Sequence, residues 1–373
     1  MSSPENKLQK DFSDLARVAL TGRTQDVQVL LQRAIKRHRD QLPGLTDKLM
    51  ELLRESPTRS SPLRKQASLS LPVDADSRLH LIRVEDNPEL SHEPVYSEKI
   101  RTVLDRVVAE RHRIEALLKA GVEPTRTVIF TGPPGVGKTL TARWLAIQLK
   151  RPLIILDLAA VMSSYLGRTG GNLRQVLDFA KSVDCVLLLD ELDAIAKRRD
   201  DNSEVGELKR LVTVLIQEID DWPATGLLLA ATNHAELLDP AIWRRFDERV
   251  EFSLPNSEAI QNFVMAQLSE ESVDAKLWSR ILSLSFKKSS FSDVERALKN
   301  ARRGAALNGG DLHKHLLSVV KSEGLDKGEL ISLATELVHS KLMTQRSAHE
   351  LTGVARDTIR AHMHDRQNSE GAQ

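Results

Sequence analysis

Continuous apolar runs recur through the middle of the chain, and each is followed by a polar residue or a turn. A run that is apolar at every position is typical of a strand buried on both faces in a parallel sheet, whereas a half-exposed strand alternates. The strands predicted in this way are residues 127–130, 153–156, 186–189, 227–231 and 250–254. Amphipathic stretches separate these strands, so the pattern predicts an α/β fold.

Both flanks of this core have helical patterns. After Pro255 the apolar residues recur every three or four positions, as they do on one face of a helix. A further helix is expected to open at residues 289–294, with Ser292 as its N-cap. Ahead of the core, residues 98–119 predict a helix that leads into the sheet. The core is therefore expected to stand between helical segments.

The first part of the chain has an organisation of its own. Short amphipathic stretches at residues 12–19, 24–35 and 45–53 predict a small helical bundle. Ser and Pro then dominate residues 56–76, which is linker composition. The predicted domains are an N-terminal helical bundle at 1–55, a Ser/Pro-rich linker at 56–93, the large α/β domain at 94–255, a small helical domain at 256–322 and a C-terminal helical extension at 323–373.

The loop after the first predicted strand reads Gly-Pro-Pro-Gly-Val-Gly-Lys-Thr. Its backbone N–H groups are expected to surround phosphate oxygens, Lys138 to reach the β- and γ-phosphates, and the Thr139 hydroxyl to bind Mg²⁺. The helix that follows directs its N-terminal dipole at the same anion. Gly135 and Gly137 are expected because a Cβ would obstruct the phosphate. The residues predicted to bind ATP are Gly132, Pro133, Pro134, Gly135, Val136, Gly137, Lys138, Thr139 and Leu140.

Polar side chains follow two further predicted strands. Asp190 and Glu191 come directly after residues 186–189, and Asn233 follows the strand at 227–231. In α/β folds, ligands bind at the carboxyl ends of the strands. We expect Asp190 to hold Mg²⁺, Glu191 to act as general base on the attacking water, and Asn233 to position that water or the γ-phosphate. The presence of both acids favours ATP hydrolysis over simple binding.

Composition adds bounds to this interpretation. A length of 373 residues suggests two or three domains, and 53 basic against 52 acidic residues leave a net charge of +1. That balance gives no overall indication of a nucleic-acid surface. The only cysteine, Cys185, excludes an internal disulfide and fits a reducing cytosol. There is no apolar run near eighteen residues and no signal-like start, so a cytoplasmic protein with no membrane contact is expected.

The order of these motifs resembles the AAA family of ATPases. The phosphate loop, Leu-Leu-Leu-Leu-Asp-Glu, Ala-Thr-Asn, Leu-Asp-Pro-Ala and Arg-Arg-Phe-Asp follow one another between about Pro94 and Val320. The resemblance implies a P-loop NTPase fold, with a parallel five-stranded sheet, helices on both faces and an α-helical lid. It also implies a Mg²⁺-dependent ATPase that assembles with itself, in a nucleotide-dependent way, into a hexamer with a central pore.

Two features of the sequence resemble the parts of the family that act between subunits or on substrates. Arg244 and Arg245 are adjacent, as in the spastin and katanin branch, which implies arginine fingers that reach the nucleotide of a neighbouring subunit. Tyr165, Leu166 and Gly167 resemble the family's first pore loop, whose aromatic side chain grips a protein substrate. Plain alternatives are a surface arginine pair and a tyrosine packed at a helix end.

The lid turn departs from the family pattern. Relatives carry Ser-Gly-Ser-Asp or Ser-Gly-Ala-Asp at the turn that approaches the adenine and ribose, whereas Phe291 replaces the glycine here. The resemblance therefore does not extend to a backbone contact between this turn and the nucleotide.

The end of the chain resembles a helix-turn-helix, from Thr344 to Arg360. Gly353 would take the positive φ that the turn requires. In that register Arg356, Thr358 and Arg360 could face a major groove of DNA, although His349 stands where such motifs favour alanine. Tight helix pairs also serve as plain packing units, so both interpretations stay open.

Two functions from different classes follow. The first is an ATP-driven ring motor that unfolds, disassembles or remodels a protein substrate. A partner protease and a role in bacterial defence are implied by a resemblance to single-ring bacterial AAA ATPases that occur beside subtilisin-like proteases. The alternative is an ATP-gated regulator or scaffold that binds DNA through the C-terminal helix-turn-helix.

Overall fold

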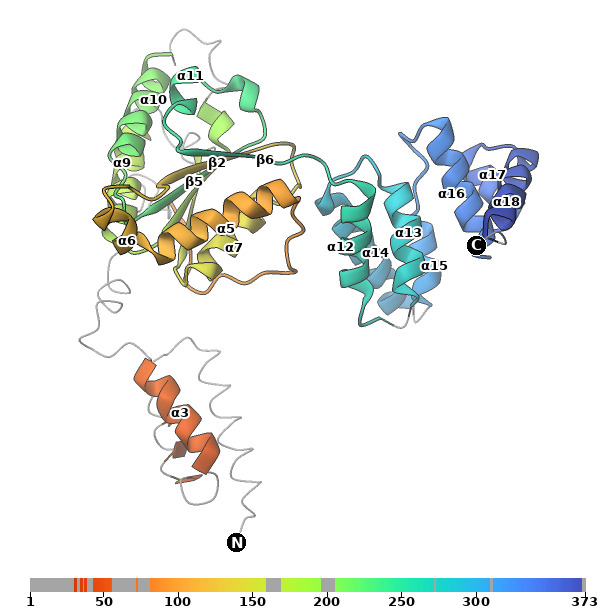
Figure 1. Cartoon of the computed structure of the whole chain (residues 1–373), viewed down its shortest axis with the longest axis horizontal. Coiled ribbons are helices and arrows are strands. Elements are labelled where there is room, and N and C mark those ends of the chain that lie inside the picture. The colour runs from red at the N-terminus through yellow and green to blue at the C-terminus, as the bar shows by residue number, and fades with distance from the viewer. Residues whose placement is uncertain are drawn as a thin grey trace. The chain divides into compact units, whose positions relative to one another are not determined.

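The structure is a computed structural model of the chain. It describes residues 30–31, 34–35, 37–38, 43–55, 72, 81–158, 169–195, 205–271, 273–308 and 311–370. The chain divides into two compact units, Met1–Ser70 and Leu71–Gln373. The second unit contains all of the predicted motifs (Figure 1).

A six-stranded sheet forms the centre of the second unit, in the order β1-β3-β4-β5-β2-β6. Strands β2 to β6 are parallel, which confirms the predicted five-stranded parallel sheet. The strands are β1 (Arg83–Glu85), β2 (Thr127–Thr131), β3 (Leu153–Asp157), β4 (Val186–Asp190), β5 (Leu227–Thr232) and β6 (Glu248–Glu251). Because residues 127–131, 186–189 and 227–232 are buried at every position, these strands carry no alternation.

Strand β1 lies within the segment predicted as linker, and the sequence analysis did not predict it. It pairs antiparallel with β3, where Arg83 stands opposite Ile155. The strand is only three residues long and Val84 is its single apolar residue, so neither alternation nor a continuous apolar run marks it. The linker assignment therefore extends too far along the chain.

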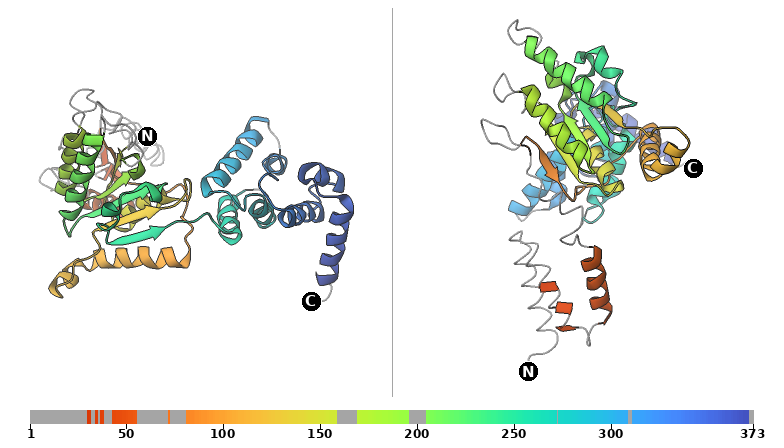
Figure 2. Two further views of the ribbon diagram at one scale, coloured as in Figure 1. Left: turned by 90° about the horizontal axis from the view of Figure 1, so that it is seen from above. Right: turned by 90° about the vertical axis from the view of Figure 1, so that its left-hand side faces the viewer.

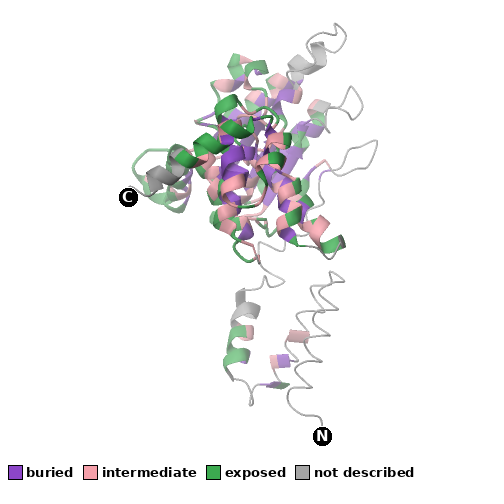
Figure 3. Ribbon diagram, turned by 90° about the vertical axis from the view of Figure 1, so that its right-hand side faces the viewer, coloured by how far each residue is buried: buried purple, intermediate pink, exposed green. Residues whose placement is uncertain are grey.

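Helices cover both faces of the sheet, as predicted (Figure 1, Figure 2). On one face, Leu188 packs in a cluster with residues of α5 (Glu98–His112) and α7 (Lys138–Gln148). On the other, Leu187 and Leu189 pack with residues of α9 (Thr169–Ser182) and α10 (Val205–Asp220). Buried positions concentrate in the strands between these layers (Figure 3). Short elements at the rim are α6 (Ile114–Lys119), the 3-10 helices η1 (Leu192–Ile195) and η2 (Ala235–Leu237), and α11 (Pro240–Trp243).

A helical lid follows the sheet, with one buried apolar cluster of its own. It consists of α12 (Ser257–Leu268), α13 (Ala275–Ser285), α14 (Phe291–Asn308) and α15 (Leu312–Ser318). The start of α14 corrects one prediction, because Ser290 caps this helix and Ser292 does not. Ser290 Oγ accepts the Asp293 N–H at 3.2 Å, and Asp293 Oδ2 accepts the Ser290 N–H at 3.1 Å. This reciprocal pair is a capping box that begins two residues earlier than expected.

The C-terminal extension is helical, with α16 (Lys327–His339), α17 (Gln345–Thr352) and α18 (Arg356–Glu370). Gly353 ends α17 in the left-handed region at φ 71°, which confirms the predicted turn. In the first unit, α3 (Pro43–Glu55) coincides with the third predicted helix. The first predicted helix, at 12–19, lies outside the described residues, and the second is described only in part. Among the described helices, none has the length and apolar character needed to cross a bilayer.

Candidate functional site

The loop between β2 and α7 takes its shape from three glycines with positive φ. Gly132, Gly135 and Gly137 have φ values of 136°, 78° and 101°. A Cβ on Gly132 would lie 2.0 Å from the Phe252 carbonyl oxygen, and one on Gly135 would lie 2.5 Å from Ser290 Oγ. Contacts within the protein therefore require glycine at both of these positions. Gly132 lets the loop pass the end of the sheet, and Gly135 lets the lid turn approach.

The lid touches this loop directly. The Ser292 N–H donates to the Gly135 carbonyl at 3.1 Å. This bond holds the first turn of α14 against the loop, so a shift of the loop would also shift the start of α14. Ser292, assigned from sequence as a helix cap, is instead the residue that joins the lid to the phosphate loop.

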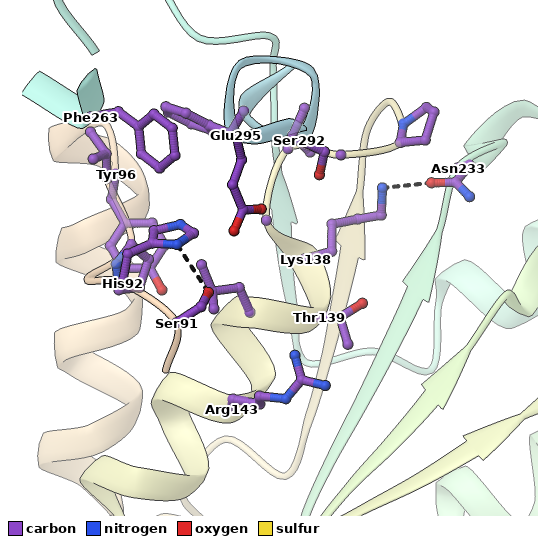
Figure 4. A pocket seen from close by; sticks show the side chains of 18 of the residues that line it. Ser91, His92, Tyr96, Lys138, Thr139, Arg143, Asn233, Phe263, Ser292 and Glu295 are labelled. Atoms are coloured by element: carbon purple, nitrogen blue, oxygen red, sulfur yellow. Dashed lines mark hydrogen bonds between the residues drawn. The ribbon is translucent and has the colours of Figure 1, made fainter. Parts of the chain in front are cut away.

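The Lys138 ammonium group is buried beneath the loop. Its Nζ donates to Gly132 O at 2.6 Å and to Pro133 O at 2.9 Å. It also donates to Asn233 Oδ1 at 2.7 Å (Figure 4). Burial lowers the pKa of Lys138, and the charges of Asp190 and Asp193 oppose that shift. The charge of Lys138 is thus held at the junction of the loop and the end of β5, where a bound phosphate would meet it.

Thr139 and Asp190 come together as predicted. Thr139 Oγ1 donates to Asp190 Oδ2 at 3.2 Å. Mg²⁺ takes oxygen ligands and is usually held by one or two protein groups together with substrate phosphates. A hydroxyl and a carboxylate side by side at the carboxyl end of β4 fit that requirement, so the residues present are suited to Mg²⁺.

Glu191 occupies a strained backbone position directly after β4. Its φ is 54°, in the left-handed region that side chains other than glycine rarely adopt. The Glu191 N–H donates to Asp190 Oδ1 at 3.0 Å, which helps to hold the turn. Such a conformation costs on the order of 1–3 kcal/mol and is found often at active sites. Glu191 is exposed and lines the cavity, where a general base would need to be.

Asp193 is a residue of the site that the sequence analysis missed. It is 3% exposed, and its Oδ1 accepts the Thr232 hydroxyl at 3.1 Å and the Asn233 N–H at 3.3 Å. These bonds fix the end of β5, and with it Asn233, beside Asp190. The only signal in the sequence is an acid two residues after Glu191.

The other end of the cavity is aromatic. The rings of His92 and Phe263 lie 4.9 Å apart edge to face, and those of Phe263 and Phe291 lie 5.4 Å apart. Ser91 Oγ lies 3.0 Å from His92 Nδ1, and Glu295 also lines this end (Figure 4). Burial lowers the pKa of His92, and the nearby charge of Glu295 opposes that shift. The phosphate loop and these rings share one cavity of about 390 Å³.

These aromatic residues come from a predicted linker and a predicted lid, and no motif joins them. Phe291, which departs from the family pattern, turns its ring toward the same cavity instead of leaving the turn bare. An aromatic surface at one end and a phosphate loop at the other together suit a nucleotide with a flat base.

The unpredicted strand also reaches the site. Arg143, on α7, lines the cavity and binds Glu85 of β1 through two contacts, Nε to Oε2 at 2.9 Å and Nη2 to Oε1 at 3.1 Å. This bidentate pairing lowers the pKa of Glu85. Strand β1 is therefore tied to the helix that carries the phosphate loop.

The predicted arginine pair lies outside this cavity. Arg244 and Arg245 are exposed at the end of α11, Arg245 Nη1 lies 3.3 Å from Asp220 Oδ2, and neither arginine lines the cavity of its own chain. Tyr165, Leu166 and Gly167 lie outside the described residues, so their assignment as a pore loop stays a prediction.

Comparison with known proteins gives consistent matches. The model of the ATPase family associated with various cellular activities (AAA) matches residues 128–254. The chain is 32% identical over 285 residues to an uncharacterized AAA family ATPase, y4kL, of Sinorhizobium fredii, and the match covers 76% of this chain and 86% of that protein.

Matches that cover a smaller share of the chain are found with proteasome-activating nucleotidases. It is 32% identical over 224 residues to that of Methanothermobacter thermautotrophicus and 34% identical over 225 residues to that of Archaeoglobus fulgidus. Each match covers 57% of this chain, and 55% and 56% of those two proteins. The chain therefore spans about half the length of these nucleotidases.

Proposed function

Because this chain belongs to the AAA family of ATPases, and so binds and hydrolyses ATP, we propose that it is a ring motor that unfolds, disassembles or remodels a protein substrate. The relatives named proteasome-activating nucleotidases support this kind of work, since their name describes ATPases that serve a protein-degrading machine. We further propose that the motor acts on a protein substrate in the cytoplasm. A partner protease and a role in bacterial defence are also part of this proposal.

In the proposed reaction, the loop and Lys138 bind the β- and γ-phosphates, and the aromatic end receives the base. Glu191 takes a proton from the attacking water as that water approaches the γ-phosphorus. Asn233 orients the water, and its own position is set by Lys138 and Asp193. Thr139 and Asp190 would hold Mg²⁺, which supplies charge neutralisation to the phosphates.

One observation supports the proposed ring assembly. Arg244 and Arg245 are both exposed, and both are absent from the cavity of their own chain. An arginine finger supplied by another subunit must be exposed in the isolated subunit and remote from its own nucleotide. A head-to-tail contact of this kind closes into a ring by rotation, and we propose a hexamer in line with the family resemblance.

The test of the ring is a mixing experiment. The Arg244→Ala/Arg245→Ala variant is expected to bind ATP with unchanged affinity and to lose turnover by about 10³-fold. Added to the wild type in rising proportion, it should lower activity more steeply than dilution, because each subunit depends on its neighbour. An Arg113→Ala/Arg303→Ala variant removes the same charge from other exposed positions and serves as control. Full activity of the double variant as a monomer would exclude fingers acting between subunits.

Substrate handling is tested at the predicted pore loop. Tyr165→Ala should abolish the remodelling of a tagged, folded reporter protein while basal ATP hydrolysis continues, and Tyr165→Phe should retain both. Normal remodelling by Tyr165→Ala would mean that threading is the wrong mechanism. Proteins retained by an ATP-loaded Glu191→Gln variant would identify substrates and any partner protease.

A second candidate function is an ATP-gated regulator that binds DNA. The observation that favours it is the turn at Gly353, which joins α17 to α18 with the backbone geometry expected of a helix-turn-helix. It does not exclude the motor, because the same ATPase could serve both.

A further inference from the structure

Helix α16 belongs to two apolar clusters at once. Its Leu333 and Leu337 are fully buried in the cluster of the lid. Its Ala334 is buried in a second cluster, together with Ala348 of α17 and Ile359 of α18. Because one rigid helix contributes to both cores, a rotation of the lid would carry α17 and α18 with it.

Ion pairs reinforce this junction. Glu329, in the first turn of α16, lies 2.9 Å from Lys287 Nζ and 3.4 Å from Lys288 Nζ. Glu336, further along the helix, lies 3.4 Å from Arg280 Nε of α13. The bond from the Asp326 backbone N–H and the pairing with Lys287 lower the pKa of Glu329 to about 2, so this carboxylate is charged at neutral pH.

The same loop leads to the nucleotide. Helix α13 ends at Ser285, Lys287 and Lys288 follow it, and Ser290 and Ser292 come within the next five residues, at the phosphate loop. A continuous path of contacts therefore runs from Gly135 through the lid turn to Glu329 and α16. The path begins at the cavity and ends at the α17–α18 pair.

A side-chain contact holds the turn between α17 and α18. His349 Nδ1 lies 2.8 Å from the Val354 carbonyl oxygen, across the glycine. His349, which stands where helix-turn-helix motifs favour alanine, thus stabilises the turn. Ala348 and Ile359 are fully buried in one cluster, so the two helices pack directly on each other, as the two helices of a DNA-reading pair do.

The exposed side of this pair offers groups that read DNA. Arg356 and Arg360 project from the first turns of α18, with Arg360 67% exposed, and Arg346 of α17 is 75% exposed. Arginine binds guanine edges and phosphates, and the 95% exposed Asp357 can accept from cytosine. In a helix-turn-helix the first residues of the second helix meet the bases.

We propose that α17 and α18 bind double-stranded DNA, with α18 in the major groove, and that α16 couples this binding to the nucleotide beneath the lid. The inference rests on the second candidate function and needs no protein remodelling. The α17–α18 pair has four arginines against four acidic residues, Glu350, Asp357, Asp365 and Glu370, so each module has no net charge and single-module binding is weak. Several modules in one ring could bind the same duplex together, and the resulting avidity would exceed the affinity of one module by about 10²- to 10⁴-fold.

The first experiment measures DNA binding by the full chain. A fluorescent 30-base-pair duplex of mixed sequence is titrated by anisotropy at 50 to 200 mM salt, in parallel with selection from a randomised duplex library. The Arg356→Ala/Arg360→Ala variant should lose about tenfold or more in affinity and show a shallower salt dependence. Arg113→Ala/Arg303→Ala, with the same change of charge, should bind like the wild type. ATP hydrolysis without DNA should be equal in all three proteins.

The second experiment measures the coupling. The DNA affinity of the Glu191→Gln variant should differ between its ATP-bound and ADP-bound states by about 5- to 150-fold, and saturating duplex should change the ratio of its affinities for ATP and ADP by the same factor. Lys287→Ala/Lys288→Ala should keep DNA binding and reduce that factor.

Each outcome decides between these claims. No duplex binding at 50 mM salt in either nucleotide state, with hydrolysis intact, would overturn the DNA module and leave the motor standing. Tighter binding to RNA of the same sequence would overturn it as well. Binding that ignores the nucleotide would overturn the coupling through α16.

Discussion

Lys138 Nζ lies 2.7 Å from Asn233 Oδ1, so the phosphate loop and the end of β5 are joined by one hydrogen bond between the two residues. The bond orients the Asn233 amide, since its oxygen is engaged by the ammonium and its NH₂ group is left to face another acceptor. That arrangement suits a residue that must position a water molecule beside a phosphate.

The first prediction separates the two halves of this amide. Asn233→Asp keeps an acceptor for Lys138 and removes the NH₂ donor, whereas Asn233→Ala removes both. If the NH₂ group orients the attacking water, both variants should lose about 10²-fold in kcat while ATP affinity changes little. Steady-state hydrolysis and binding of a fluorescent ATP analogue measure the two effects. Near-normal turnover by Asn233→Asp would assign the residue to positioning Lys138 alone.

The second prediction concerns the cap of α14. Ser290→Ala removes the hydroxyl that accepts the Asp293 N–H, so it should destabilise the lid by about 1 kcal/mol. Urea unfolding followed by fluorescence measures this change, and Ser289→Ala, one residue earlier, is the control. If the destabilising substitution proves to be Ser292→Ala, the cap has been assigned to the wrong serine.

Much of the nucleotide site could be predicted because its residues follow one another in the chain. The phosphate loop, Asp190 and Asn233 each end a strand whose apolar run is plain in the sequence. Parallel strands bring their carboxyl ends to one edge, so the proximity of these residues follows from topology. In the structure Lys138 contacts Asn233 and Thr139 contacts Asp190, so these residues do lie at one edge of the sheet.

The rest depends on contacts between distant segments, for which no local pattern exists. His92 and Phe263 meet although one belongs to the approach to the sheet and the other to the lid. Strand β1 has too few residues to give a period. The roles of Arg244, Arg245 and Tyr165 stay predictions, since a second subunit or a substrate would be needed to complete them.

The third prediction uses the half-buried imidazole of His92. Its pKa in the folded chain lies below the ordinary value of 6.5, so between those two values the unfolded chain binds more protons than the folded one. Stability should therefore fall as the pH is lowered from 7.5 through 6.5 toward the folded pKa. Thermal midpoints of the wild type and of His92→Gln, measured at pH 7.5 and pH 5.5, should converge as the pH falls. A difference independent of pH would contradict a lowered pKa of His92 in the folded chain.

The fourth prediction tests the aromatic end of the cavity as the place of the base. Phe291→Gly introduces the glycine of the family pattern that the lid turn resembles, and it removes a ring that packs on Phe263. Because stacking of a base on an aromatic ring is worth roughly 1–3 kcal/mol, the variant should bind ATP at least about fivefold more weakly.

Inorganic tripolyphosphate provides the matched ligand for this variant, since it has the phosphates and lacks the base. Phe291→Gly should bind tripolyphosphate as the wild type does, because the contacts of Lys138 and the loop are untouched. Calorimetry on both ligands then isolates the contribution of the base from that of the phosphates. An equal loss for the two ligands would mean that Phe291 acts on the fold of the lid turn, which holds Gly135 through Ser292, and that the base binds elsewhere.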